Sequence, residues 1–234
     1  MDLNQFRRMS VPLCKASKSF NKVFGIGANK TGTTTLQAIF GIVGLNVAPQ
    51  DEGELYGVQA MKGNLKPLAE YVNRYDAFQD APFSLKTTYA QLDALFPGSK
   101  FILTYRDADA WFDSLHNFHR KIFGVPEGRE IRREDLHAFR SAYPGYLDYV
   151  AGINWALEVS GEVDIRQDYG LLYNREHYKK IYRERNEAIV RHFYERPNDL
   201  LVLDITREQD TSKVVKFLGL PDSLITNVPH LNKT

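Results

Sequence analysis

The sequence is short of cysteine, of long apolar runs and of net charge. Its 234 residues contain one cysteine, Cys14, which excludes an intrachain disulfide framework and a zinc site built on cysteines. No apolar run approaches the roughly 18–20 residues needed to span a bilayer. The formal net charge is +1, so composition offers no broad electrostatic argument for binding nucleic acid or an anionic membrane. Any positively charged site must therefore be local.

Residues 1–21 are basic but hold no apolar stretch of about 7–15 residues, the core of a secretory signal. We therefore expect an N-terminal arm in a cytoplasmic protein. Apolar residues make up 43% of the chain and charged residues 25%, as in soluble globular proteins. No repeat, low-complexity tract or linker divides the sequence, so we predict one domain over 1–234.

Short apolar segments alternate with amphipathic ones along the chain. β-Branched and aromatic runs predict buried strands at 22–27, 75–80, 100–106 and 200–205. Apolar residues at helical spacing predict helices over 33–44, 88–96, 107–123 (with Asp107 as its cap), 176–195 and 210–220. This order is typical of βαβ units, so we predict an α/β fold, a three-layer sandwich with a mostly parallel central sheet.

Residues 124–172 are less regular. Pro144-Gly145 interrupts what the pattern predicts to be two helices, and we expect a helical insertion that forms a lid or a wall of the substrate site. The aromatic residues of this stretch suit an acceptor pocket and ordinary helix packing equally well. They are Phe139, Tyr143, Tyr146, Tyr149, Trp155, Tyr169 and Tyr173.

The segment GIGANKTGTTT (25–35) joins the first predicted strand to the first helix. In the loop that binds nucleoside triphosphates, a lysine directly follows the second glycine. Here Thr33 follows Gly32, and the only lysine of the loop is Lys30. Backbone N–H groups in such a loop, together with the positive end of the next helix, form an anion site. The alternative is a glycine-rich turn with threonine caps and no ligand.

Two motifs together resemble the sulfotransferase family. KTGTTT (30–35) is similar to the K-[ST]-G-[ST]-[ST] loop that binds the 5′-phosphosulfate of 3′-phosphoadenosine 5′-phosphosulfate (PAPS). FILTYRDADAWFDSL resembles the family's 3′-phosphate site, in which a strand-end arginine, here Arg106, is followed by a helical serine, here Ser114. The ending FLGLPDSLITNVPHLNKT is also similar. Thr35 stands where many cytosolic members have tryptophan, and their R-K-G element is absent, so the resemblance is to a divergent, bacterial-type branch with a P-loop NTPase-like fold.

The resemblance implies in-line transfer of a sulfuryl group from PAPS to a hydroxyl, or less often an amine, with no metal. Lys30 would stabilise the leaving oxygen. We expect Asp80, at the end of a predicted strand, to be the general base, although it could equally form a turn before Pro82. The predicted cofactor-binding residues are Asn29, Lys30, Thr31, Gly32, Thr33, Thr34, Thr35, Arg106 and Ser114.

His116 and His119 are rival bases, with ordinary helical histidines as the alternative. His230 could close over the cofactor or cap the C-terminal tail, and Lys86 could be a second active-site lysine or a solvated one.

Two other functions stay open. A P-loop kinase or NTPase would use Asp204, after the apolar run LLVL, and Thr34 to order magnesium. A non-enzymatic relative would bind only an anion or a protein partner. The acceptor, whether a small molecule, saccharide or lipid, and the oligomeric state are not predicted.

Overall fold

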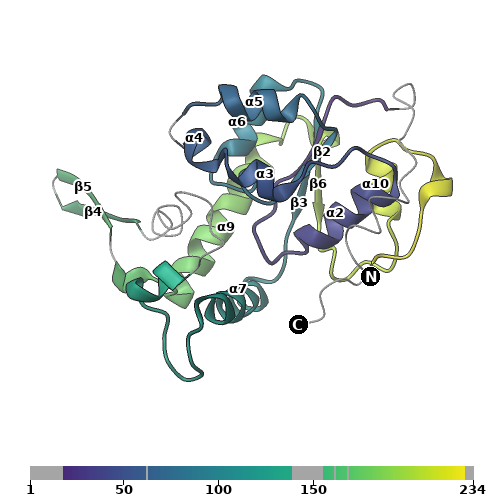
Figure 1. Ribbon diagram of the computed structural model, residues 1–234. Coiled ribbons are helices and arrows are strands. Elements are labelled where there is room, and N and C mark those ends of the chain that lie inside the picture. Colours follow the sequence, from purple (N-terminus) through teal and green to yellow (C-terminus); the bar gives the residue numbers. More distant parts are fainter. Residues whose placement is uncertain (1–17, 62, 139–154, 161, 168, 230–234) are drawn as a thin grey trace. The chain divides into compact units, whose positions relative to one another are not determined.

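The computed structural model describes residues 18–61, 63–138, 155–160, 162–167 and 169–229. The described residues contain a four-stranded sheet, whose strands lie in the spatial order β2-β1-β3-β6 (Figure 1). The neighbouring strands are parallel throughout the sheet. The four strands are β1 (Val23–Gly25), β2 (Ala77–Gln79), β3 (Lys100–Thr104) and β6 (Leu200–Leu203). The predicted parallel α/β sheet is thereby confirmed.

Helices connect these strands, as parallel pairing requires. They are α2 (Thr33–Ile42), α3 (Gln50–Glu54), α4 (Gly57–Met61), α5 (Lys66–Val72), α6 (Thr88–Leu95), α7 (Ala108–Phe123), α9 (Arg175–His192) and α10 (Ser212–Phe217). Short 3-10 turns cover Arg133–Ala138, Tyr169–Leu171, Pro197–Asp199 and Asp222–Leu224. None of the described helices is long and apolar enough to cross a bilayer.

The chain divides into two compact units. The first takes its residues from 1–106 and 185–234 and carries the sheet, and the second is 107–184. The single domain predicted over 1–234 stays a prediction, as does the N-terminal arm, of which residues 1–17 lie outside the described part.

The sheet of the first unit is covered on both faces. On one face the ring of Phe24 packs against those of Phe78 and Phe101, with centroids 5.1 and 5.4 Å from its own. These rings belong to a buried apolar cluster that also includes side chains of α5, α6 and α9. On the other face Val23 and Ile102 pack against α2 and α10. Successive strand residues point to opposite faces, so Val23 and Phe24 serve different layers. The sheet is therefore the middle of three layers, as predicted.

The second unit contains α7, whose first turn is capped as predicted. The Asp107 carboxylate accepts hydrogen bonds from the backbone N–H of Asp109 at 3.0 Å and of Ala110 at 3.1 Å. Two of the N–H groups that a helix start leaves without a helical partner are thus satisfied. Further along α7, Trp111 stacks on Tyr182 of α9, with ring centroids 4.2 Å apart.

An antiparallel hairpin lies inside the insertion that was predicted to be helical. β4 (Trp155–Ser160) pairs with β5 (Glu162–Gln167) over six residue pairs. The helical prediction is therefore wrong for these segments. Residues 139–154 lie outside the described part, as do the side chains of Trp155 and Tyr169, so the predicted acceptor pocket and lid stay predictions.

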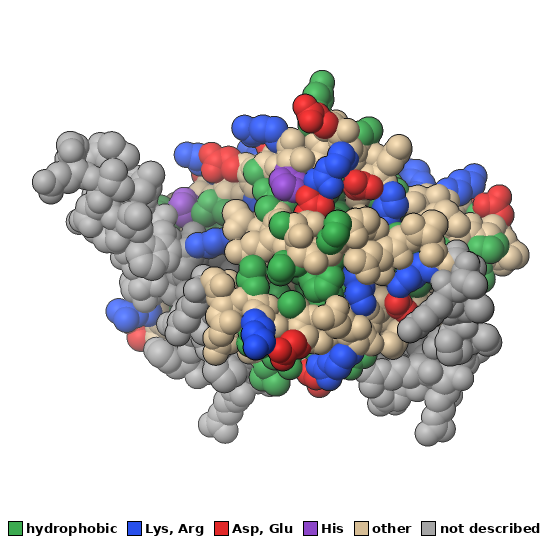
Figure 2. Space-filling model, turned by 90° about the horizontal axis from the view of Figure 1, so that it is seen from above, with side chains coloured by type: hydrophobic (Ala, Val, Ile, Leu, Met, Phe, Trp, Pro, Cys, Tyr) green, Lys and Arg blue, Asp and Glu red, His purple; other side chains and the backbone are tan. Residues whose placement is uncertain are grey.

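Basic and acidic side chains are interspersed on the face that Figure 2 shows. This mixture agrees with a net charge of +1 over the whole sequence. A positively charged site among the described residues must accordingly consist of a few local groups.

Candidate active site

The loop after β1 leads directly into α2, and its last residue has a conformation suited to glycine. Gly32 precedes the helix with φ 94° and ψ 24°, in the left-handed region. Among the described residues no side chain caps this end of α2, and its first turn holds no acidic residue. The N–H groups of the first turn and the positive end of the helix dipole are therefore available to an anion.

Two glycines let the loop pass close to neighbouring strands. A Cβ on Gly27 would lie 2.0 Å from the Oγ1 and 2.3 Å from the carbonyl oxygen of Thr104, at the end of β3. A Cβ on Gly32 would lie 2.3 Å from Cγ2 of Ile205, just beyond β6. The loop is thus seated against the carboxyl ends of two strands, the edge where parallel α/β sheets bind ligands.

Thr31 fastens the loop from inside. Its side chain is fully buried, and its hydroxyl donates to the Ala28 carbonyl oxygen at 2.6 Å and lies 2.7 Å from the Thr104 hydroxyl. A contact between this hydroxyl and a ligand would require these hydrogen bonds to break. We therefore assign the Thr31 side chain to holding the loop, and its predicted cofactor contact stays a prediction. The sequence analysis did not single out Thr104. Its position, as a polar residue that follows the apolar run at 101–103, could have indicated a functional or structural role.

Lys30 adopts a backbone conformation that is uncommon for a residue with a side chain. Its φ is 70°, a left-handed value that costs roughly 1–2 kcal/mol outside glycine. Such strain persists where the surrounding structure imposes it, and it gathers at functional sites. Lys30 is half-buried, and its charge is among the groups that lower the pKa of Asp80.

Asp80 follows β2 and meets the first turn of α2. The carboxylate accepts a hydrogen bond from the Thr33 hydroxyl at 3.0 Å and another from the Ala81 backbone N–H at 2.8 Å. The side chain is buried, with 8% of the residue exposed, and its φ of 62° is also left-handed. Burial raises the pKa of Asp80, while the hydrogen bonds from Ala81 and Thr33, then Gln50 and the Lys30 charge, oppose that rise.

The structure thus brings Asp80 together with Lys30 and Thr33, which the sequence proposed from a different segment, the loop at 30–35. Thr34 and Thr35 occupy the same first turn of α2 and are half-buried. Asn29 is half-buried in the loop, and the Ser84 hydroxyl lies 3.5 Å from its Oδ1.

Arg106 and Ser114 belong to different units. Arg106 lies two residues beyond the end of β3 and is half-buried, at the end of the first of the two segments that form the first unit. Ser114 is half-buried on α7 of the second unit. Their predicted joint grip on one phosphate stays a prediction.

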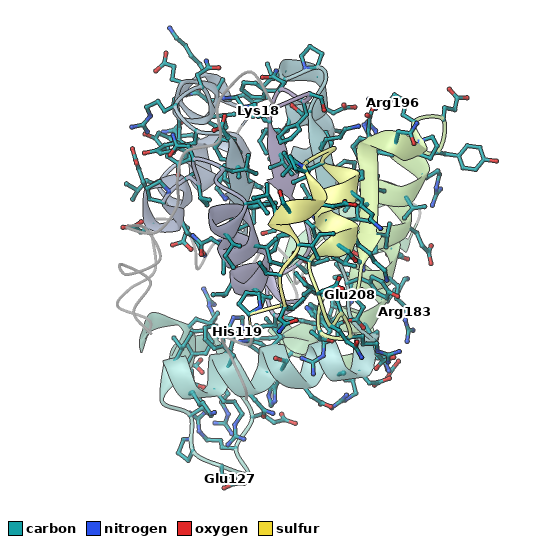
Figure 3. All side chains as sticks on the ribbon, turned by 90° about the vertical axis from the view of Figure 1, so that its right-hand side faces the viewer. Lys18, His119, Glu127, Arg183, Arg196 and Glu208 are labelled. Carbon is teal, nitrogen blue, oxygen red and sulfur yellow. The ribbon has the colours of Figure 1, made fainter. Side chains whose placement is uncertain are left out.

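The rival histidines lie in the second unit. His119, labelled in Figure 3, is buried, and its Nδ1 lies 2.6 Å from the hydroxyl of Tyr173. His116 stacks on Phe112 with ring centroids 5.7 Å apart. Burial lowers the pKa of His116, and the nearby Arg120 lowers it further. His230 lies outside the described residues, and Lys86 is exposed just before α6.

Asp204, the magnesium-ordering residue of the kinase alternative, has partners within its own turn. Its carboxylate accepts from the Thr206 hydroxyl at 2.6 Å and backbone N–H at 3.1 Å, and pairs with Arg207 at 3.3 Å. Within the described ranges no group of three or more histidine, cysteine, aspartate or glutamate residues could hold a metal ion.

A polar network missed by sequence reasoning adjoins Asp80 on the side of α3. Gln50 contacts both Gln79, at the end of β2, and Glu54 of its own helix. Gln79 could have been noticed in the sequence, because it is an amide residue within a buried apolar strand. The sequence does not distinguish Gln50 or Glu54 in the same way, because their contacts depend on how α3 packs.

Comparison with known families finds a match to the sulfotransferase domain over residues 22–234. No curated protein matches the sequence. The match covers most of the chain and includes the loop, α2, β2 and Asp80.

Proposed function

Because this chain belongs to the sulfotransferase domain family, we propose that it transfers a sulfuryl group from PAPS to a hydroxyl or amine of an acceptor. The observation that carries the proposal is the start of α2, which has no side-chain cap among the described residues and lies beside Lys30 and Asp80. This end of the helix suits the 5′-phosphosulfate, because its N–H groups and dipole favour a negatively charged group.

The donor would be held at its two charged ends. For the phosphosulfate we propose the backbone of Gly32 and the first turn of α2, together with the side chains of Thr34 and Thr35. For the 3′-phosphate we propose Arg106 and Ser114, since a guanidinium can bind phosphate through two parallel hydrogen bonds. PAPS supplies the sulfuryl group as a substrate, and we propose no metal in the reaction. The full set of proposed donor contacts is Asn29, Lys30, Thr31, Gly32, Thr33, Thr34, Thr35, Arg106 and Ser114.

Lys30 would act on the leaving side. As the bond between sulfur and the bridging oxygen breaks, negative charge develops on that oxygen, and the ammonium group of Lys30 stabilises it. The left-handed backbone of Lys30 supports this role, because residues held in such strained conformations gather at functional sites.

Asp80 would act on the acceptor side. Its carboxylate takes the proton of the acceptor hydroxyl while the hydroxyl oxygen forms its bond to sulfur. Burial raises the pKa of Asp80, and a carboxylate whose pKa lies closer to neutral is a stronger base. The hydrogen bond from Thr33 fixes the carboxylate next to the helix that would hold the donor.

The test is transfer of radiolabelled sulfate from PAPS to a panel of phenols, sugars, amines and lipids. We expect Lys30→Ala to lower kcat by about 10²–10³ and Asp80→Asn by about 10²–10⁴. Lys66→Ala, which removes an exposed lysine of α5, is the matched control and should leave the rate unchanged. Equal rates in all four proteins would refute the assigned roles. Tight nucleotide binding with no transfer to any acceptor would favour the non-enzymatic alternative.

A further inference from the structure

Arg185 of α9 contacts the backbone from which the loop after β1 begins. Its Nη2 donates a hydrogen bond to the carbonyl oxygen of Ile26 at 2.9 Å, and both residues belong to the first unit. Ile26 directly follows β1 and is fully buried. Its own N–H donates to the carbonyl oxygen of Ile102 in β3 at 2.9 Å. The backbone at Ile26 is therefore held by the sheet through its N–H and by a charged side chain through its carbonyl group.

Arg185 continues a row of buried apolar side chains on α9. Residues four apart lie on the same face of a helix, and this face carries Phe193, Ile189 and then Arg185. Phe193 and Ile189 are buried in the apolar cluster of the sheet. Phe193 packs on Phe101, near the start of β3, with ring centroids 4.8 Å apart. The face that packs on the sheet thus changes from apolar to cationic where it reaches the carboxyl end of β1.

The charge of Arg185 is not needed for the hydrogen bond to Ile26. A neutral side-chain amide could donate to the same carbonyl oxygen. The Nε and Nη1 atoms of Arg185 are buried, and taking a guanidinium out of water is expensive because it keeps its charge at every working pH. The use of a charged group at this position therefore indicates a role beyond the hydrogen bond. An anion bound by the adjoining loop would gain from a fixed positive charge here.

The hydrogen bond also orients the first amide of the loop. A peptide unit is planar and trans, so its N–H points away from its carbonyl group. Because the Ile26 carbonyl is directed at Arg185, the N–H of Gly27 points to the opposite side of the chain. Gly27 has little room to turn over, since a Cβ there would lie 2.0 Å from Oγ1 of Thr104. Arg185 thus fixes the loop at its entry, as Thr31 fixes it from inside.

We propose that Arg185 is a positioning residue for donor binding, which fixes the entry of the loop after β1 and supplies a permanent positive charge beside it. The inference rests on the proposed function, in which this loop holds the phosphosulfate of PAPS. Arg185 touches the backbone of the loop and not the donor, so its charge acts alike on the bound donor and on the transition state. It should therefore change KM for PAPS more than kcat. The alternative is an arginine that only stabilises the fold.

Three substitutions separate the charge of Arg185 from its hydrogen bond. Arg185→Lys keeps a charge and an N–H donor, Arg185→Gln keeps a donor without the charge, and Arg185→Met keeps neither. Arg191→Met is the matched control, because it removes an exposed arginine from the same helix and the same unit. Urea unfolding of each variant shows whether it is folded under the conditions of the two measurements that follow.

The first measurement is calorimetric binding of 3′-phosphoadenosine 5′-phosphate, ADP and ATP, which does not depend on activity. We expect Arg185→Gln and Arg185→Met to bind the 3′-phosphorylated nucleotide about tenfold more weakly than wild type, the order of effect that a unit charge has on an anion in the same site. Arg185→Lys and Arg191→Met should bind it within about threefold of wild type. Wild-type affinity in Arg185→Gln would overturn the inference.

The wild-type protein separates this inference from the proposed function. If it prefers ATP, and Arg185→Gln weakens the binding of ATP instead, PAPS is refuted as the donor while the role of Arg185 in holding an anion stands. If it prefers the 3′-phosphorylated nucleotide and Arg185→Gln shares its affinity, the donor stands and Arg185 is only structural. If it binds none of the three nucleotides, the donor site and the inference fall together.

The second measurement is the steady-state kinetics of sulfuryl transfer. In Arg185→Gln the KM for PAPS should rise about tenfold while kcat stays within a few-fold, and Arg185→Lys should restore most of the loss. A loop that was merely distorted would misplace the phosphosulfate and lower kcat as well. A fall in kcat with KM unchanged, or a loss that lysine does not restore, would therefore overturn the inference.

Discussion

Gly32 is the residue at which the structure makes the sharpest mechanical prediction. Its φ of 94° is strained for any residue with a side chain, and a Cβ placed there would lie 2.3 Å from Cγ2 of Ile205. Ile205 is 2% exposed, so the methyl group has little room to retreat. We therefore expect Gly32→Ala to suffer two separate penalties, one from the backbone and one from the clash.

The size of the loss follows from adding these two effects. A left-handed backbone costs a non-glycine residue roughly 1–2 kcal/mol. Forcing an extra methyl group into a filled site costs about 1–3 kcal/mol. The free energy of unfolding should thus fall by about 2–5 kcal/mol, a large part of the 5–15 kcal/mol typical of a folded domain.

Urea unfolding of a set of variants tests this reasoning. Gly98→Ala is the control, because Gly98 has φ 76° and a Cβ there would find nothing within 4 Å, so only the backbone penalty of roughly 1–2 kcal/mol applies. Adding Ile205→Ala to Gly32→Ala removes the clash, so the double variant should lose less stability than the two single losses combined, by about 1 kcal/mol or more.

The reasoning would be refuted if Gly32→Ala were no less stable than Gly98→Ala. Fully additive losses in the double variant would also show that the alanine methyl group does not meet Ile205.

Three further predictions concern stability. Burial raises the pKa of Asp80 in the folded state, so folded protein binds more protons than unfolded protein above the unfolded pKa, and stability falls as pH rises through the folded value. Asp80→Asn should therefore unfold at higher urea than wild type at pH 7, with the gap closing below about pH 4; a less stable variant at pH 7 would contradict this. Thr31→Val should lose about 1–3 kcal/mol, because it leaves the buried Thr104 hydroxyl without its partner, and combining it with Thr104→Val should cost less than the sum. The hydrogen bond from Arg196 lowers the pKa of Asp93, so Asp93→Asn should destabilise the protein at neutral pH, and the difference should vanish as the pH falls below about 4.

Most of the sheet could be predicted because its signals are local. The apolar run at 100–106 became β3, and the helical spacing after Asp107 became α7 with the expected cap. The hairpin of β4 and β5 was missed because the whole stretch 124–172 was expected to be a helical insertion interrupted at Pro144-Gly145. Trp155, Leu157 and Val159 alternate with polar or small residues instead, the period of a strand.

Residues of the candidate site could be predicted only where a single segment shows a recognisable motif or position. Lys30 and Thr33 follow from the loop motif, and Asp80 from its place at a strand end. The hydrogen bond between Thr31 and Thr104 joins residues 73 positions apart, so neither segment by itself could predict that the two side chains meet. Gln50 likewise meets Gln79 only because α3 packs beside β2.

We propose that the loop and Arg106 bind a 3′-phosphorylated nucleotide, and calorimetry without magnesium measures this binding without any acceptor. We predict that 3′-phosphoadenosine 5′-phosphate binds more tightly than ADP or ATP, and that Arg106→Ala loses this preference while still folding. Tighter binding of ATP, increased further by magnesium, would contradict this proposal and favour the kinase or NTPase alternative, in which Thr34 and Asp204 order the metal.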